Sequence, residues 1–161
     1  MRHSVLLAMG VVITLVPASL AGTVKQSPGF NFVYVDDWGT RIDTYDSTLT
    51  KDLVLDPDTT IHFVISKADL DTVYQMVTEI GFFDRSWPHP GWSGCVGAIP
   101  SPTITFQASL GEDTRRLSWR WLCTDDDSRV RELSRLALFI SRMIRRQPEY
   151  KALPRPRGGY F

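Results

Sequence analysis

The chain has 161 residues, of which 18 are Lys or Arg and 18 are Asp or Glu, so its formal net charge is zero. A balanced charge is not typical of a general nucleic-acid-binding protein, which is basic overall. The charge is unevenly spread, however. Residues 22–84 contain 11 acidic and 4 basic side chains, whereas residues 85–161 contain 13 basic and 7 acidic ones.

The first 21 residues have the pattern of a secretory signal peptide. Arg2 gives a basic start, Ser4 to Val16 is mostly apolar, and Ala21 is a small residue suited to cleavage. The apolar stretch is shorter than the roughly 20 residues that cross a bilayer, so we expect no membrane span. Thr23 stands where a bacterial lipoprotein would have cysteine. The sequence therefore predicts cleavage near Ala21 and release into the periplasm or the medium.

Residues 22–161 form a single predicted domain. In chain order, we expect strands at 30–35, 41–46, 48–55 and 60–65, with a turn at Asp56-Pro57-Asp58. Ser66 is the expected N-cap of a helix that carries an apolar stripe from Leu70 to Ile80 and ends at Gly81.

The second half contains the clearest hairpin. Apolar and polar residues alternate in 103–110 and again in 115–123, which is typical of strands with one buried face. We expect the polar face of this hairpin to be exposed and available to a partner. A helix over about 128–147 follows, stopped by Pro148, and then an irregular tail. These elements predict a two-layer α+β fold, a mostly antiparallel sheet with two amphipathic helices on one face.

Cys95 and Cys123 are the only cysteines, and an exported protein with two cysteines is expected to join them in a disulfide. Cys95 lies in a Pro- and Gly-rich connection over residues 87–102. Long connections of this kind are often functional. Trp87, His89 and Trp92 lie before Cys95, where the disulfide would hold the connection, so they form a candidate recognition loop. The alternative is that both tryptophans pack onto the core.

The second predicted helix carries a basic ridge. Arg131, Arg135, Arg142 and Arg146 fall on one side of a helical wheel, opposite the apolar stripe. Arginine binds carboxylates, phosphates and sulfates bidentately, so the ridge is a candidate anion-binding site. The alternative is a solvated surface that the acidic N-terminal half neutralises.

The sequence offers little for catalysis or metal binding. Gly91-Trp92-Ser93-Gly94-Cys95 matches neither the serine-hydrolase elbow nor the papain-type signature. The two histidines after the signal peptide, His62 and His89, are far apart, and the aspartate pairs lack the spacing of a calcium loop. We therefore expect no cofactor and no metal.

Three segments, 39–60, 70–84 and 148–161, resemble an uncharacterised family of small exported bacterial proteins, many of them lipoproteins. The shared features are a "DT…TKD" segment, a helix ending in "EIxFF" and a tail like "PEYxxLPxxxGGY". The resemblance implies export but no activity.

The sequence favours a monomeric, non-enzymatic binding protein whose partner is an envelope protein or an anionic polymer. A small hydrolase and a protease inhibitor that presents residues 87–92 stay open as alternatives.

Overall fold

The structure is a computed structural model, and it describes residues 29–84, 86–87, 103–120 and 128–159. Six strands form one sheet in the order β4-β3-β2-β1-β5-β6, and every neighbouring pair is antiparallel. The strands are β1 (Phe30–Val35), β2 (Arg41–Asp43), β3 (Thr48–Leu53), β4 (Asp56–His62), β5 (Thr103–Leu110) and β6 (Asp113–Arg120). The helices are α1 (Lys67–Glu79), α2 (Ser128–Arg146) and α3 (Pro148–Ala152). The predicted α+β class with a mostly antiparallel sheet is confirmed.

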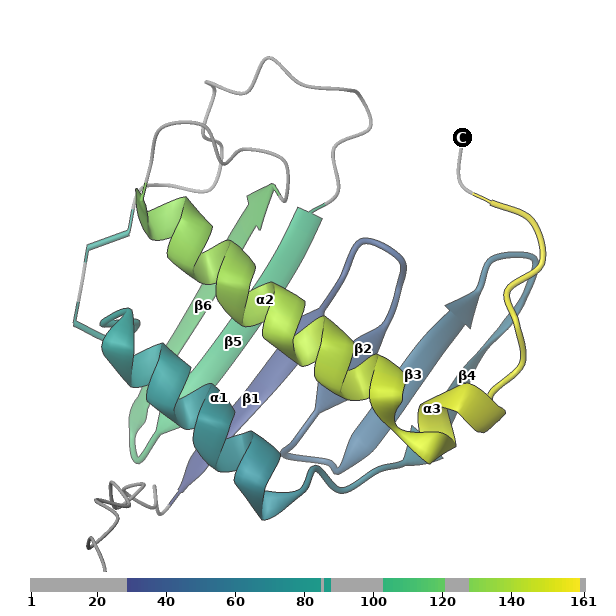
Figure 1. The fold of residues 1–161 in the computed structure, drawn as a ribbon, viewed down its shortest axis with the longest axis horizontal. Coiled ribbons are helices and arrows are strands. Elements are labelled where there is room, and N and C mark those ends of the chain that lie inside the picture. The colour runs from purple at the N-terminus through teal and green to yellow at the C-terminus, as the bar shows by residue number, and fades with distance from the viewer. Residues whose placement is uncertain (1–28, 85, 88–102, 121–127, 160–161) are drawn as a thin grey trace, which may run out of the picture.

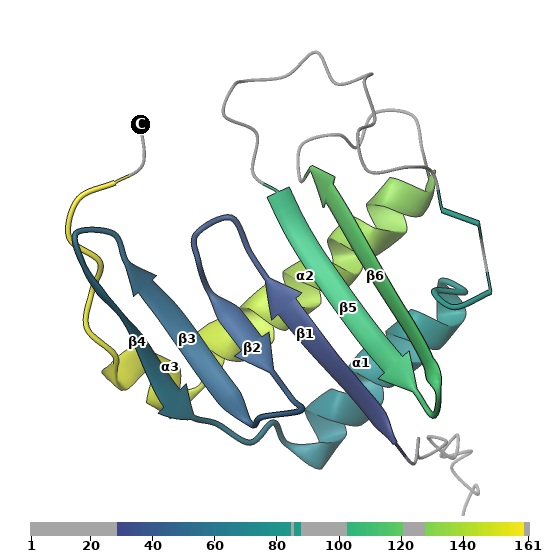
Figure 2. The same cartoon turned by 180° about the vertical axis from the view of Figure 1, so that it is seen from behind.

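Helices α1 and α2 both lie in front of the sheet in Figure 1 and behind it in Figure 2. The sheet side chains that enter the core come from alternate positions, such as Phe30, Phe32 and Tyr34 of β1. They pack against the apolar stripes of the helices, including Val73 on α1 and Leu136 on α2. Alternation in the strands and the helical stripes therefore build a single core between two layers.

Helix α1 begins as the sequence predicts. The Ser66 hydroxyl accepts a hydrogen bond from the backbone N–H of Asp69 at 3.1 Å, and it donates to the Asp69 carboxylate at 2.8 Å. Ile80 is the C-cap, and Gly81 follows with a φ of 64°. A glycine suits this left-handed position, which ends the helix.

Strands β2, β3, β4 and β6 have other bounds than predicted, and one predicted turn was wrong. Strand β3 ends at Leu53 and not at Leu55, and β6 begins at Asp113 and not at Arg115. Strand β2 ends at Asp43 because the Asp43 carboxylate accepts from the N–H groups of Tyr45 and Asp46 and thus forms a turn. Strand β4 starts at Asp56, where the sequence predicted a turn. The chain reverses instead at Val54, whose φ is 66°, with a hydrogen bond of 2.8 Å from Leu55 N–H to the Leu53 carbonyl.

The C-terminal tail is more regular than expected. Pro148 begins the short helix α3 after α2 has ended at Arg146. Further on, Arg157 donates its backbone N–H to the Leu53 carbonyl at 3.2 Å, and its guanidinium pairs with Asp56. The tail therefore docks on the β3–β4 turn. None of the helices in the described residues is long and apolar enough to cross a membrane.

Candidate anion-binding surface

Helix α2 presents three arginines of the predicted ridge to solvent. Arg131, Arg135 and Arg142 are all exposed, whereas the opposite side of the helix, from Val130 to Ile144, enters the core. At 1.5 Å per residue, the three positions span about 16 Å along the helix axis. They form a line of cations on the outer surface of the helix layer, and we use "Arg ridge" below for these three residues.

The fourth predicted member of the ridge has another role. The Arg146 guanidinium forms an ion pair with the carboxylate of Asp69, at the start of α1. A long side chain in the last turn of α2 can reach the neighbouring helix, and here it contacts the buried Asp69, three residues after the N-cap Ser66. Arg146 is exposed like the other three, but its charge is paired across to α1, so it is left out of the Arg ridge.

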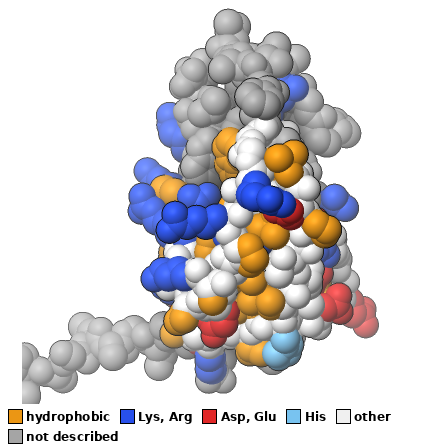
Figure 3. All heavy atoms as spheres, turned by 90° about the vertical axis from the view of Figure 1, so that its right-hand side faces the viewer, with side chains coloured by type: hydrophobic (Ala, Val, Ile, Leu, Met, Phe, Trp, Pro, Cys, Tyr) orange, Lys and Arg blue, Asp and Glu red, His pale blue; other side chains and the backbone are white. Residues whose placement is uncertain are grey.

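Of the four predicted arginines, the acidic N-terminal half pairs only with Arg146 among the described residues. Within the described part of the chain, none of the three guanidinium groups forms an ion pair. Figure 3 shows Lys and Arg side chains gathered along its left-hand edge, the side of the molecule that carries the helices. The ridge thus keeps its charge in the fold, as an anion-binding surface requires.

Helix stability does not account for all of the ridge. A cation near the C-terminus of a helix is favourable, so the macrodipole suits Arg142. Arg131 stands in the first turn, where the same dipole opposes a positive charge, and that turn of α2 contains no acidic residue. The macrodipole therefore does not favour a cation at this position.

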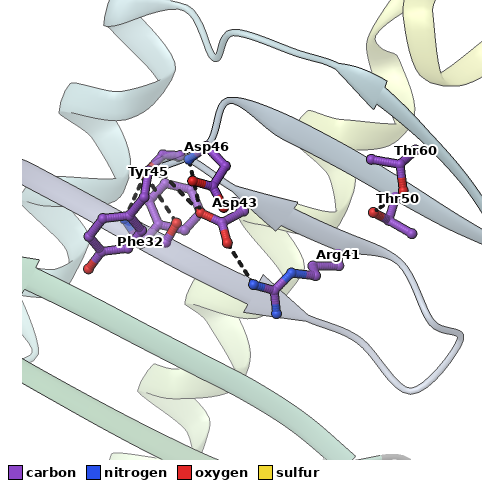
Figure 4. A network of polar contacts seen from close by, with 8 residues as sticks. Phe32, Arg41, Asp43, Tyr45, Asp46, Thr50 and Thr60 are labelled. Carbon is purple, nitrogen blue, oxygen red and sulfur yellow. Dashed lines mark hydrogen bonds and ion pairs between the residues drawn. The ribbon is translucent and has the colours of Figure 1, made fainter.

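The sheet face opposite the helices is polar and uncovered by any described helix. Cross-strand neighbours there form a row of Asp43, Val33, Gln107 and Arg116. A hollow of about 370 Å³ lies over this row. Figure 4 shows part of this face, where Arg41 donates to Asp43 at 2.6 Å. The sequence predicted that the polar hairpin face would be exposed. Thr103, Arg116 and Arg120 are exposed, whereas Thr105, Gln107 and Ser118 are half-buried.

The loop that opens the second half is described only at its start. The Trp87 side chain is half-buried, its ring lies 6.4 Å from that of Phe82, and its indole N–H donates to the Phe82 carbonyl at 3.1 Å. Trp87 therefore contributes to packing rather than standing free in solution. His89, Trp92, Cys95 and Cys123 lie outside the described residues, as does the predicted signal peptide.

The described histidine and acidic side chains do not assemble a recognisable chemical centre. His62 is exposed at the end of β4. It lines neither the hollow over the open sheet face nor a second hollow between the β1–β2 turn and α2. No group of three or more His, Cys, Asp or Glu residues within the described ranges is placed to hold a metal ion.

Sequence reasoning missed one group of polar residues. Tyr34, Asp36 and Arg145 line a second hollow, between the β1–β2 turn and α2. Asp36 lies in the turn after β1, and Arg145 lies in the last turn of α2. No local pattern could have paired them, because they are more than a hundred positions apart in sequence.

The fold and these surfaces define the class, a two-layer α+β protein with an open antiparallel sheet face and a basic helix. No family model, no curated protein and no solved structure matches the chain. The resemblance to exported bacterial proteins thus stays a prediction.

Proposed function

We propose that this protein is an exported, non-enzymatic binding protein that holds an anionic polymer of the cell envelope along the Arg ridge. The observation that supports this most is that Arg131, Arg135 and Arg142 are exposed on one side of α2 and unpaired among the described residues. Planar guanidinium groups bind carboxylates and sulfates bidentately, and a line of them matches a repeating anion.

A polymer fits the ridge better than a folded protein partner does. Stable protein interfaces are centred on buried aromatic and apolar anchors. The large hydrophobic side chains that are exposed among the described residues are Trp38, Tyr45, Leu55 and Val64, and none of them lies on α2. The export part of the proposal is supported by the basic start and apolar stretch of residues 1–21.

The test is retention on immobilised heparin, a sulfated polysaccharide, at low salt. Reversing two charges of the ridge with Arg135→Glu and Arg142→Glu should abolish retention. The matched control reverses two arginines of β6, Arg116→Glu and Arg120→Glu, and should keep most of it. Exposed charges contribute only about 0–1 kcal/mol per pair to stability, so both variants should unfold near the wild-type temperature.

Equal losses in the two variants would mean that only overall charge matters, and the assignment to α2 would fail. If the wild type is retained neither on heparin nor on a polyuronate column, the proposal that the ligand is an anionic polymer is wrong. Capture of an acidic envelope protein through the same residues would replace the polymer with a protein partner.

A further inference from the structure

A hollow of about 300 Å³ lies between the β1–β2 turn and α2. Its apolar lining comes from Ile104 of β5 and Leu138 of α2, and the turn contributes the indole of Trp38. Trp38 is 57% exposed, which is unusual for so large an aromatic side chain when nothing covers it. A hollow of this size suits a small molecule with a compact apolar group.

A buried carboxylate stands at one side of this hollow. Asp36 is only 8% exposed, and one of its oxygens, Oδ1, accepts from the N–H groups of Trp38 at 3.0 Å and Thr40 at 2.8 Å. The Thr40 side chain also hydrogen-bonds this carboxylate. Burial raises the pKa of Asp36, while the hydrogen bonds from Thr40 and Trp38 and the charge of Arg145 oppose that rise.

An arginine of α2 lines the same hollow as this carboxylate. Arg145 is exposed and forms no ion pair within the described residues. Its charge lowers the pKa of both Asp36 and Tyr34, against the effect of burial, so all three groups act on one another through the same space. The Tyr34 hydroxyl also has no hydrogen-bond partner among the described residues, although its side chain is 1% exposed.

We propose that this hollow binds a free amino acid with an apolar side chain, as a zwitterion. The ligand carboxylate lies on Arg145, its ammonium group lies on the Asp36 carboxylate, and its side chain lies against Trp38 and Leu138. Two opposite charges that line one hollow without pairing are bridged best by a ligand that carries both charges. A ligand with only a carboxylate would leave the buried Asp36 without a cation, and a ligand with only an ammonium group would lose the bidentate contact with Arg145.

The proposal is tested by calorimetric titration of the purified protein with four probes. L-Phenylalanine supplies both charges and an apolar side chain, 3-phenylpropionate lacks the ammonium, 2-phenylethylamine lacks the carboxylate, and glycine lacks the side chain. We expect L-phenylalanine to bind at least about tenfold more tightly than each of the others, since each lost contact is a charge-assisted bond or a buried ring. Equal binding by either single-charge analogue, or no binding of L-phenylalanine at millimolar concentration, would overturn the proposal.

Two exposed arginines of α2 provide matched variants. Arg145→Gln should weaken L-phenylalanine binding about tenfold, whereas Arg142→Gln should leave it unchanged. Thermal unfolding of both variants should match the wild type, because both side chains are exposed. Equal affinity in wild type and Arg145→Gln contradicts the proposal. Heparin retention tests the ridge separately, so either binding activity can fail without the other.

Discussion

At the scale of single residues, the Asp36 carboxylate is a buried charge held by hydrogen bonds within its own turn. It fixes the β1–β2 turn by accepting from two backbone N–H groups, and burial makes its ionised form costly. Because burial raises the pKa of Asp36 above its ordinary value of 3.8, the folded protein binds a proton more tightly than the unfolded chain does. The contribution of Asp36 to stability is therefore greatest at low pH and falls as pH rises through this window.

The direction of this pH dependence of stability can be measured with the variant Asp36→Asn. The amide oxygen can still accept from the two N–H groups, but it does not ionise. We expect the free energy of unfolding of the wild type to fall relative to that of the variant as pH rises from about 4 to 7. Denaturant unfolding at each pH provides the comparison, and parallel curves for wild type and Asp36→Asn would contradict it.

At the scale of elements, local sequence patterns located most of the strands and helices but misplaced one reversal. Asp56-Pro57-Asp58 has turn-forming residues, yet β4 begins there and the chain turns at Val54. A β-branched residue rarely adopts a positive φ. The Asp52 carboxylate accepts the Val54 N–H at 2.6 Å, and Arg157 from the tail binds the Leu53 carbonyl, so contacts distant in sequence stabilise this turn. Turn propensity alone does not contain that information.

The β1–β2 turn has the opposite character, because glycine is required there for two reasons. Gly39 has a φ of 70°, and a Cβ added to it would lie 2.3 Å from the Cβ of Asp52. Gly111, in the β5–β6 turn, has a φ of 63° but nothing within 4 Å of such a Cβ. A substitution at Gly111 therefore tests backbone strain alone, whereas a substitution at Gly39 tests strain together with a steric clash.

We expect Gly111→Ala to lower the free energy of unfolding by about 1–2 kcal/mol, the cost of a left-handed conformation. Gly39→Ala should cost at least about 1 kcal/mol more, because strand β3 must also move away. Chemical denaturation of both variants measures this. If the two substitutions cost the same, Asp52 yields freely and the close approach has no energetic consequence.

At the scale of the whole molecule, the sequence predicted the two layers because period-2 and period-3.6 patterns each bury one side of an element. It also located the Arg ridge, since a helical wheel needs only the helix to exist. It could not show that Arg146 pairs with Asp69 or that Trp87 packs on Phe82, because both contacts depend on how the helices and loops meet. The hollow of Tyr34, Asp36 and Arg145 was missed for the same reason.

The central claim is that α2 holds the anionic polymer. The most direct test follows the arginine Nε–H signals by NMR while a sulfated oligosaccharide is added. We expect the signals of Arg131, Arg135 and Arg142 to shift together and saturate, because their guanidinium groups bind the sulfates. Those of Arg116 and Arg120 on the open sheet face should stay in place. Saturating shifts on the sheet face with an unchanged ridge would contradict the account.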